Sequence, residues 1–334
     1  MMKARRGIAL MAAMWLVVAI AAVALEFSLA ARDRRVLGLA AADRGHERAA
    51  AMGALAQMQA RMEYDLRNGP SASATGVSGL RASDPWLDAD SLYSGIVYVD
   101  SVPVTVVAHD LGMGVNINTI AEANLQIMLG FVLGDATTAT KITQSIMDWR
   151  DADDNARSNG AERDQYLKDN LLVLPTNGPF REVDDLIYVY GMTPDLLELI
   201  RPYVTTHAAS TVRVNINTAP EPVLRSLPGM TDQILNQIPA LRSSGRRITS
   251  VAQVMTATNR GRPTGGGRGG QLTPQQQRLQ ATQTQLTNAT TVNTTDVELT
   301  LLVRDSTRVQ TTKLVAVISR VGTTNQSNIS WQLW

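Results

Sequence analysis

An uncharged apolar stretch near the N-terminus constrains this chain more than any other feature of its sequence. Between Ile8 and Leu25 there is no charged residue, and the only strong hydrogen-bonding side chain is that of Trp15. As a helix this stretch rises about 27 Å, close to the ~30 Å hydrocarbon core of a bilayer. Lys3, Arg5 and Arg6 precede it, so the positive-inside rule predicts a cytoplasmic N-terminus and places the bulk of the chain across the membrane.

Three interpretations of this start remain open. The first is a signal peptide cut before Ala31, although the apolar run exceeds the usual ~7–15 residues of such peptides. The second is an uncleaved membrane anchor. The third is a short basic leader that ends at Gly7, so that the mature chain begins with Ile8. A basic leader, a glycine and then an apolar helix resemble the start of prepilins, which a peptidase cleaves after the glycine.

Composition narrows the class of function. The chain has 334 residues, enough for two domains beyond a membrane helix, and its net charge of +1 predicts no strong general attraction to nucleic acid. It contains no cysteine and only three scattered histidines, which excludes disulfides, thiolate metal sites and cysteine nucleophiles. No nucleophile-elbow sequence is present either. We therefore expect the protein not to be an enzyme.

The N-terminal helix is predicted to continue well beyond the apolar stretch. Apolar residues recur at helical spacing up to about Arg67, and Asn68-Gly69-Pro70 then ends the helix. Two short strands follow, at 95–100 and 103–109. Three further strands are predicted at the C-terminal end, at 296–303, 310–321 and 328–333.

Internal repeats mark the region between these two groups of strands. Val-Asn-Ile-Asn-Thr occurs twice, at 115–119 and at 214–218, each time before a predicted helix. Residues 186–200 also align with 224–238, since each segment has a helix, a glycine turn, a threonine and a second helix. We interpret 111–258 as an all-helical domain that contains helix-hairpin-helix-like, or SAM-like, hairpins. The Gly-, Gln- and Thr-rich residues 259–295 are predicted to be a flexible loop.

An acidic segment inside this region is a candidate calcium site. Carboxylates supply the hard oxygen ligands that calcium prefers, although the spacing is not that of an EF-hand. The candidate ligands are Asp148, Asp151, Asp153, Asp154 and Glu162. The alternative is a solvated acidic turn that closes a helix, in which Arg150 or Arg157 pairs with the aspartates.

Taken in order, these motifs resemble the minor pseudopilin K family of bacterial type II secretion systems (general secretion pathway protein K). The matching pieces are Arg6-Gly7-Ile8, the two Asn-Ile-Asn-Thr segments, Asp148-Trp149-x-Asp151-x-Asp153, Gly160-Ala161-Glu162, Asn177-Gly178-Pro179-Phe180, Gly191-Met192-Thr193-Pro194 and Arg201-Pro202-Tyr203. Two positions depart from the family pattern, Arg150 in place of an aliphatic residue and Ile120 in place of Ala.

The resemblance implies an α+β, pilin-like fold in which a long N-terminal helix packs on a small antiparallel sheet and a large helical domain is inserted. It implies a leader (1–7), a transmembrane and filament-core helix (8–31), the first part of the pilin-like domain (32–110), the inserted domain (111–258), the loop (259–295) and C-terminal strands (296–334).

The resemblance also implies a function. Family members stand at the tip of the periplasmic pseudopilus, where they start assembly of the filament that exports folded proteins. Their partners are the minor pseudopilins I and J, the major pseudopilin, the prepilin peptidase and the inner membrane, and some members bind calcium. The fifth residue after the cut is Ala12 in place of the glutamate of major pilins, which suits a subunit with nothing stacked beyond it.

A second reading starts from residues 214–230, which also resemble the helix-hairpin-helix modules of membrane-anchored DNA-uptake receptors. Such modules hold a phosphate on backbone N–H groups at a helix N-terminus. Here Thr231 replaces the second glycine of the turn and Asp232 stands where the phosphate would lie, so its carboxylate repels phosphate. We therefore expect no nucleic-acid partner.

Overall fold

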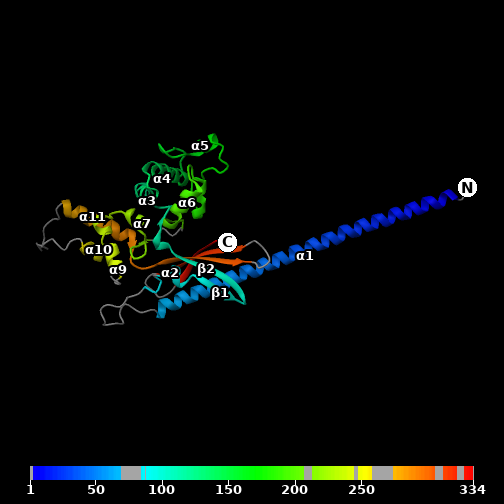
Figure 1. Cartoon of the computed structure of the whole chain (residues 1–334), viewed down its shortest axis with the longest axis horizontal. Helices are drawn as coiled ribbons and strands as arrows, with labels where there is room; N and C mark the ends of the chain where they lie inside the picture. Colours follow the sequence, from blue (N-terminus) through cyan, green and yellow to red (C-terminus); the bar gives the residue numbers. More distant parts are fainter. Residues whose placement is uncertain are drawn as a thin grey trace.

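One very long helix and one antiparallel sheet form the frame of the molecule (Figure 1). The computed structural model describes residues 3–68, 84–86, 88–206, 213–243, 247–257, 274–304, 311–321 and 327–333. Helix α1 spans Lys3–Asn68, 66 residues or about 100 Å. It ends where Asn68-Gly69-Pro70 predicted.

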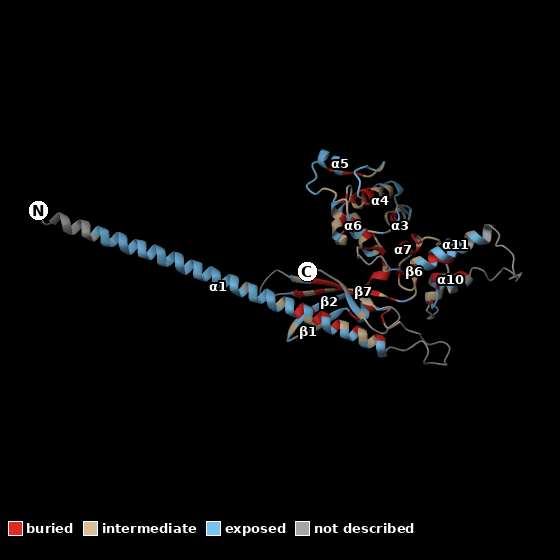
Figure 2. Ribbon diagram, turned by 180° about the vertical axis from the view of Figure 1, so that it is seen from behind, coloured by how far each residue is buried: buried red, intermediate tan, exposed pale blue. Residues whose placement is uncertain are grey.

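The two ends of α1 have different surroundings. Its first half extends away from the rest of the protein, and the large apolar side chains between Met11 and Leu39 are exposed (Figure 2). Within the described residues, α1 is the one helix long and apolar enough to cross a membrane, with a mean hydropathy of 2.2 in its most apolar window. Its second half carries a buried stripe that packs on the sheet: Ala50, Ala51, Ala54, Leu55, Met58, Met62 and Leu66.

The sheet has five antiparallel strands in the order β1-β2-β7-β8-β9. Its members are β1 (Gly95–Val99), β2 (Val102–Asp110), β7 (Asp296–Arg304), β8 (Thr311–Arg320) and β9 (Ser327–Leu333). Alternate residues of the central strands face α1, as expected for a sheet with one covered face. The hairpin between β1 and β2 turns at Asp100 and Ser101, which both have positive φ. These strands confirm the predicted pilin-like frame.

A glycine permits the close approach of α1 to the sheet edge. A Cβ built on Gly53 would lie 2.8 Å from Val99 Cγ1, whereas a Cβ on Gly45 would meet no atom within 4 Å. We expect Gly53→Leu to lower the free energy of unfolding by about 1–3 kcal/mol through overpacking. Gly45→Leu should instead raise it by up to about 1 kcal/mol, because leucine favours helix more than glycine does. Denaturant unfolding of both variants measures the difference, and equal effects would contradict this packing.

The inserted domain lies between β2 and β7. Its elements are η1 (Leu111–Met113), β3 (Val115–Asn116), α3 (Glu122–Leu133), α4 (Ala136–Arg150), α5 (Arg163–Lys168), η2 (Val183–Tyr188), α6 (Pro194–Ile200), η3 (Arg201–Tyr203), β4 (Val204–Thr205), β5 (Val214–Asn215), α7 (Glu221–Arg225), α8 (Asp232–Leu235), α9 (Ile238–Ser243), α10 (Val251–Ala257), α11 (Pro274–Ala289) and β6 (Thr290–Thr291). Helix α2 (Ala89–Leu92) precedes β1.

Two halves of the inserted domain share one plan. Each begins with Val-Asn-Ile-Asn-Thr, and the first two residues form a short strand. In the first half β3 pairs in parallel with β4, and in the second half β5 pairs in parallel with β6. In each half the chain therefore starts with a short strand, continues through helices and ends with a second strand that pairs with the first.

The second asparagine of each repeat joins two distant parts of its half. The side chain of Asn118 accepts a hydrogen bond from Phe180 N at 2.8 Å and donates to Phe180 O at 3.0 Å. Asn217 forms the same pair of bonds with Ile248, at 3.1 and 2.9 Å. An amide side chain can replace a strand partner in this way because it carries both a donor and an acceptor.

A half-buried arginine completes each half by donating to two backbone carbonyls, one in the Asn-Ile-Asn-Thr segment and one in the residue that follows it. Arg242 donates to the carbonyls of Ile216 at 2.8 Å and Ala219 at 2.7 Å. Arg150 donates to the equivalent carbonyls of the first half, those of Ile117 and Ile120. Burial lowers the pKa of both guanidinium groups. Arg150 thus binds the backbone of its own half.

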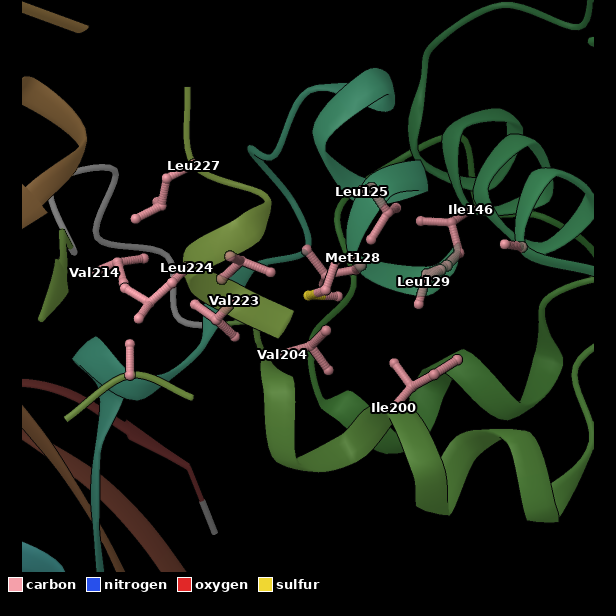
Figure 3. Close-up of a cluster of buried hydrophobic side chains, with 14 of the residues drawn as sticks. Leu125, Met128, Leu129, Ile146, Ile200, Val204, Val214, Val223, Leu224 and Leu227 are labelled. Atoms are coloured by element: carbon pink, nitrogen blue, oxygen red, sulfur yellow. The ribbon is translucent and has the colours of Figure 1, made fainter. Parts of the chain in front are cut away.

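The two halves pack around a single hydrophobic core (Figure 3). Leu125, Met128 and Leu129 of α3 lie beside Val223 and Leu224 of α7, and all five side chains are buried. The halves form one domain because neither covers its apolar side alone.

A buried carboxylate stands where the chain passes from the sheet into the inserted domain. Asp110 is 1% exposed, and one of its oxygens accepts a hydrogen bond from Gly112 N at 2.9 Å. The other oxygen accepts bonds from Thr218 at 2.9 Å, Thr294 at 3.0 Å and Asn215 at 3.3 Å. Burial raises the pKa of Asp110, and these hydrogen bonds oppose the rise. Asp110 lies where the chain enters the inserted domain, and Thr294 lies where the chain returns to the sheet. Asp110 therefore connects both of these points to the second Asn-Ile-Asn-Thr segment.

Two predictions for this region are wrong. The inserted domain is not all-helical, because the ends of each repeat pair as parallel strands. Nor is the described part of 259–295 a flexible loop, since residues 274–291 form α11 and β6, and Leu286 is fully buried. Low complexity concealed this packing, because one leucine and a few threonines supply the buried positions. The remaining part of the predicted loop, 259–273, lies outside the described residues.

Candidate functional site

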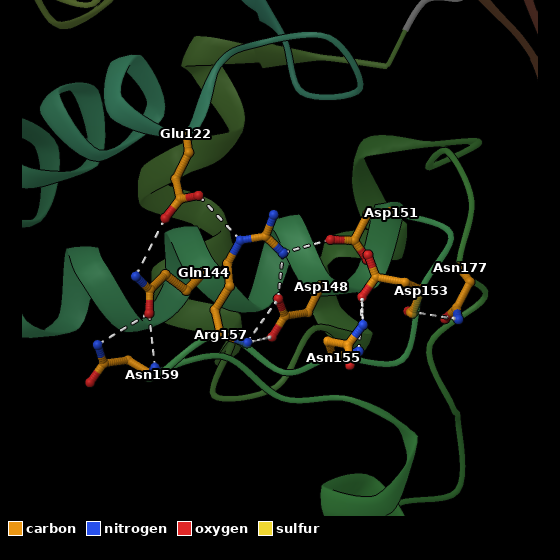
Figure 4. Close-up of polar contacts among 9 residues, drawn as sticks. All are labelled: Glu122, Gln144, Asp148, Asp151, Asp153, Asn155, Arg157, Asn159 and Asn177. Atoms are coloured by element: carbon orange, nitrogen blue, oxygen red, sulfur yellow. Dashed lines mark hydrogen bonds and ion pairs between the residues drawn. The ribbon is translucent and has the colours of Figure 1, made fainter.

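The acidic segment begins at the end of α4 and continues into a long insertion (Figure 4). In the second half five residues, 243–247, separate Arg242 from Ile248. In the first half residues 151–179 separate the equivalent Arg150 from Phe180. Every predicted ligand except Asp148 thus lies in a segment that has no counterpart in the other half.

Asp148 attaches this insertion to α4. Its side chain is fully buried and accepts hydrogen bonds from Arg157 N at 3.1 Å and from Arg157 Nη1 at 2.6 Å. The chain passes so close that a Cβ on Gly160 would lie 2.0 Å from an oxygen of Asp148. Burial raises the pKa of Asp148, against the effect of its bonds to Arg157.

Arg157 brings three carboxylates together (Figure 4). Its Nη1 lies 2.6 Å from both Asp148 Oδ1 and Asp151 Oδ2, and its Nε lies 3.2 Å from Glu122 Oε2. Burial alone lowers the pKa of Arg157, but the bonds to Asp151, Asp148 and Glu122 outweigh burial and raise it. The predicted pairing of an arginine with the acidic turn is confirmed for Arg157. It is not confirmed for Arg150, which binds backbone carbonyls.

Three carboxylates converge beyond Arg157. Oxygens of Asp151, Asp153 and Glu162 all lie within 4.8 Å of one another. Glu162 is 4% exposed, and neither of its oxygens has a hydrogen-bond partner among the described residues. Asp151 Oδ1 is also buried without a partner there. Unpartnered buried carboxylate oxygens are rare in folded proteins and indicate a missing proton or cation.

The electrostatics of Glu162 agree with this indication. The pKa of Glu162 is raised to about 7, chiefly by burial and in addition by the negative charges of Asp148, Asp151, Asp154 and Asp153. A cation among the carboxylates would lower the pKa of Glu162 and so oppose both effects, because it stabilises the ionised form.

The donor set fits a hard divalent cation such as calcium. Calcium takes oxygen ligands at about 2.4 Å, so two oxygens on opposite sides of the ion stand about 4.8 Å apart. Asp151, Asp153 and Glu162 satisfy this limit. They would provide three of the six to eight oxygens that calcium requires, and water or backbone carbonyls would provide the others.

The other two predicted ligands lie outside this group of three. Asp148 is occupied by Arg157, as described above. Asp154 accepts a hydrogen bond from Asn177 Nδ2 at 3.0 Å, and the same amide nitrogen donates to Asp153 O at 3.2 Å. Asn177 thereby joins the end of the insertion to its beginning, with a positive φ of 48°. The acidic pattern did not identify Asn177 as part of this site, although Asn177 begins the motif Asn177-Gly178-Pro179-Phe180.

The predicted processing site lies within α1. Gly7 and Ile8 are both helical in the full chain, and their side chains are outside the described set. Cleavage between them stays a prediction.

The glycine turn that resembles a DNA-binding hairpin is covered by another helix. A Cβ on Gly229 would lie 2.5 Å from the carbonyl oxygen of Thr282 in α11. Beyond the turn, Asp232 carries a carboxylate at the start of α8 and lies 3.3 Å from Arg225. A carbonyl and a carboxylate at this turn both repel phosphate, so the geometry disfavours nucleic-acid binding here.

A protein-family model matches part of the inserted domain. Residues 110–209 match the model of the first domain of "Type II secretion system (T2SS), protein K". The type II secretion system protein K of Pectobacterium carotovorum is 38% identical over 90 residues, which is 27% of each chain. That of Dickeya chrysanthemi is 33% identical over 129 residues, 36% of this chain and 35% of the relative. The matched segments thus span about a quarter to a third of these relatives.

A solved structure extends the likeness to most of the chain. It is the GspK-GspI-GspJ complex of the type 2 secretion system of enterotoxigenic Escherichia coli. The TM-score is 0.53 at 16% identity, covering 84% of this chain and 93% of the matched chain, so this likeness concerns the fold. The segments matched in sequence and the shared fold confirm the resemblance seen in the motifs: this chain is related to the type II secretion system protein K family, the minor pseudopilins K.

Proposed function

We propose that this protein is a non-enzymatic minor pseudopilin at the tip of a type II secretion pseudopilus. There it would start assembly of the filament and support export of folded proteins across the outer membrane. The likeness to protein K carries this proposal, together with the shape of α1. An exposed apolar half of a helix needs lipid or other helices around it, and the other half fixes the folded domains to it.

The proposed partners follow from the same likeness. The matched E. coli chain was solved in a complex named GspK-GspI-GspJ, and we infer that this chain assembles with its own minor pseudopilins I and J. We further propose contacts with the major pseudopilin and the prepilin peptidase. The protein would be anchored in the inner membrane by one helix, with a cytoplasmic N-terminus and its folded domains in the periplasm.

Processing after Gly7 gives the first test. We expect the protein isolated from its native membranes to begin at Ile8, because a prepilin-type peptidase would remove residues 1–7. Mass spectrometry of the N-terminal peptide measures this directly. A chain that begins at Met1 would be a static anchor and one that begins at Ala31 a released protein, and either result would contradict the filament-tip function.

We also propose that the group Asp151, Asp153 and Glu162 binds calcium as a structural ion. The unpartnered oxygens of Glu162 and Asp151 support this proposal. The ion would hold residues 151–162, at the start of the insertion, in one conformation next to the end of α4.

Removal of one ligand charge tests the calcium site. We expect Glu162→Gln to weaken calcium binding about tenfold or more, because calcium affinity follows the number of charged ligands. Asp154→Asn is the matched control, since Asp154 lies in the same segment but pairs with Asn177. Titration calorimetry of the full chain in detergent gives both affinities. Equal affinities for Glu162→Gln and the unmodified chain would refute the assignment.

A further inference from the structure

The insertion of the first half carries an exposed apolar patch at its outer end. Leu172 is 100% exposed, Leu171 is 41% exposed and Val173 is 38% exposed. Leu167 of the neighbouring α5 is 52% exposed. Figures 1 and 2 show α5 at the end of the inserted domain that lies away from the sheet. We call residues 167–173 the apolar loop.

The apolar loop is held at both of its ends. Leu171 N donates to Tyr166 O at 3.0 Å, and Leu174 packs against the core of the domain. Asn177 then binds Asp154 and the backbone of Asp153, beside the carboxylates proposed to hold calcium. The loop thus projects from a base that includes the cation site.

The plan that the two halves share does not include this loop. The second half makes the same asparagine and arginine contacts with only 243–247 between Arg242 and Ile248. Hence the plan of a half is complete without an insertion. Exposed leucines in a loop outside this shared plan indicate a binding surface, since they lower solubility without adding to the core.

The charge of the insertion identifies the kind of partner. Residues 151–179 contain six acidic and three basic residues, so the insertion stays net negative even with one calcium ion bound. Anionic phospholipids would repel such a segment, whereas a protein surface with basic residues would attract it. A fully exposed leucine with a leucine and a valine beside it can insert into an apolar pocket.

We propose that the apolar loop docks into an apolar pocket with a basic rim on a folded protein partner that takes part in export. The cation at Asp151, Asp153 and Glu162 holds the loop in its docking shape. This inference rests on the proposed pseudopilin function and on the proposed calcium site.

Export by the full chain tests the docking surface. Leu172→Asp is expected to lower export at least tenfold in cells whose own copy of the gene is deleted, with chain level and calcium affinity unchanged. Leu199→Asp is the matched control, because Leu199 is a 52% exposed leucine of α6 and should export normally. Normal export by Leu172→Asp would refute the docking proposal but not the pseudopilin function. If deletion of the whole gene leaves export intact, the pseudopilin function fails, and the docking proposal fails with it.

Two further measurements test the partner class and the role of the cation. The chain has no cysteine, so Leu172→Cys accepts a single environment-sensitive dye. We expect no blue shift of the dye emission when phosphatidylethanolamine–phosphatidylglycerol vesicles are added to the labelled chain in nanodiscs. A blue shift would mean that the apolar loop binds lipid and not a protein. Calcium should slow hydrogen exchange at 166–176 in the unmodified chain but not in Glu162→Gln. Equal exchange rates with and without calcium would overturn the coupling.

Discussion

Asp110→Ala should lower the free energy of unfolding of the inserted domain by about 2–4 kcal/mol, because buried donors lose their acceptor. The carboxylate is 1% exposed and accepts hydrogen bonds from Gly112, Asn215, Thr218 and Thr294. Alanine would remove the acceptor that these four donors share. The loss should appear first in the second half, since two of the donors belong to its repeat.

Denaturant unfolding and hydrogen exchange of the full chain in detergent measure this effect. Asp88→Ala is the matched control, because Asp88 is exposed and its side chain makes no hydrogen bond to cap α2. The control should change stability by less than about 0.5 kcal/mol. Similar losses in the two variants would mean that Asp110 does not join the domain to the sheet.

Arg242→Met should lower the free energy of unfolding by about 2–4 kcal/mol. The guanidinium donates to the carbonyls of Ile216 and Ala219, two fully buried residues, and methionine can fill the space but cannot donate. Arg150→Met should cost a similar amount, because Arg150 occupies the equivalent place in the first half.

Hydrogen exchange distinguishes the two arginine variants. Arg150→Met should raise exchange at 115–120, and Arg242→Met should raise it at 214–219, each mainly within its own half. Arg181→Met, which replaces an exposed arginine of the same domain, should leave both segments unchanged. Exchange that rises only in one half for both variants would contradict the shared plan of the halves.

Periodicity determined the frame of the molecule. The run from Ile8 to Leu25, the stop at Asn68-Gly69-Pro70 and the five strands follow from local composition, and the structure confirms their positions. Local signals are sufficient there because a helix and an antiparallel sheet with one covered face have clear periods of 3.6 and 2. The motifs, taken in order, were also sufficient to recognise the family.

Contacts between distant residues decided the rest. The sequence revealed the repeated Asn-Ile-Asn-Thr but not the parallel strand pairs, because Val204 and Thr290 become their partners only after many intervening residues. It marked five carboxylates equally, whereas folding directed Asp148 to Arg157 and Asp154 to Asn177, and left Glu162 buried without a partner. Composition likewise concealed α11, whose Leu286 is buried by tertiary packing alone. Charge and hydropathy are properties of single residues, but the pairing and burial of a charge depend on which distant segments the fold brings beside it.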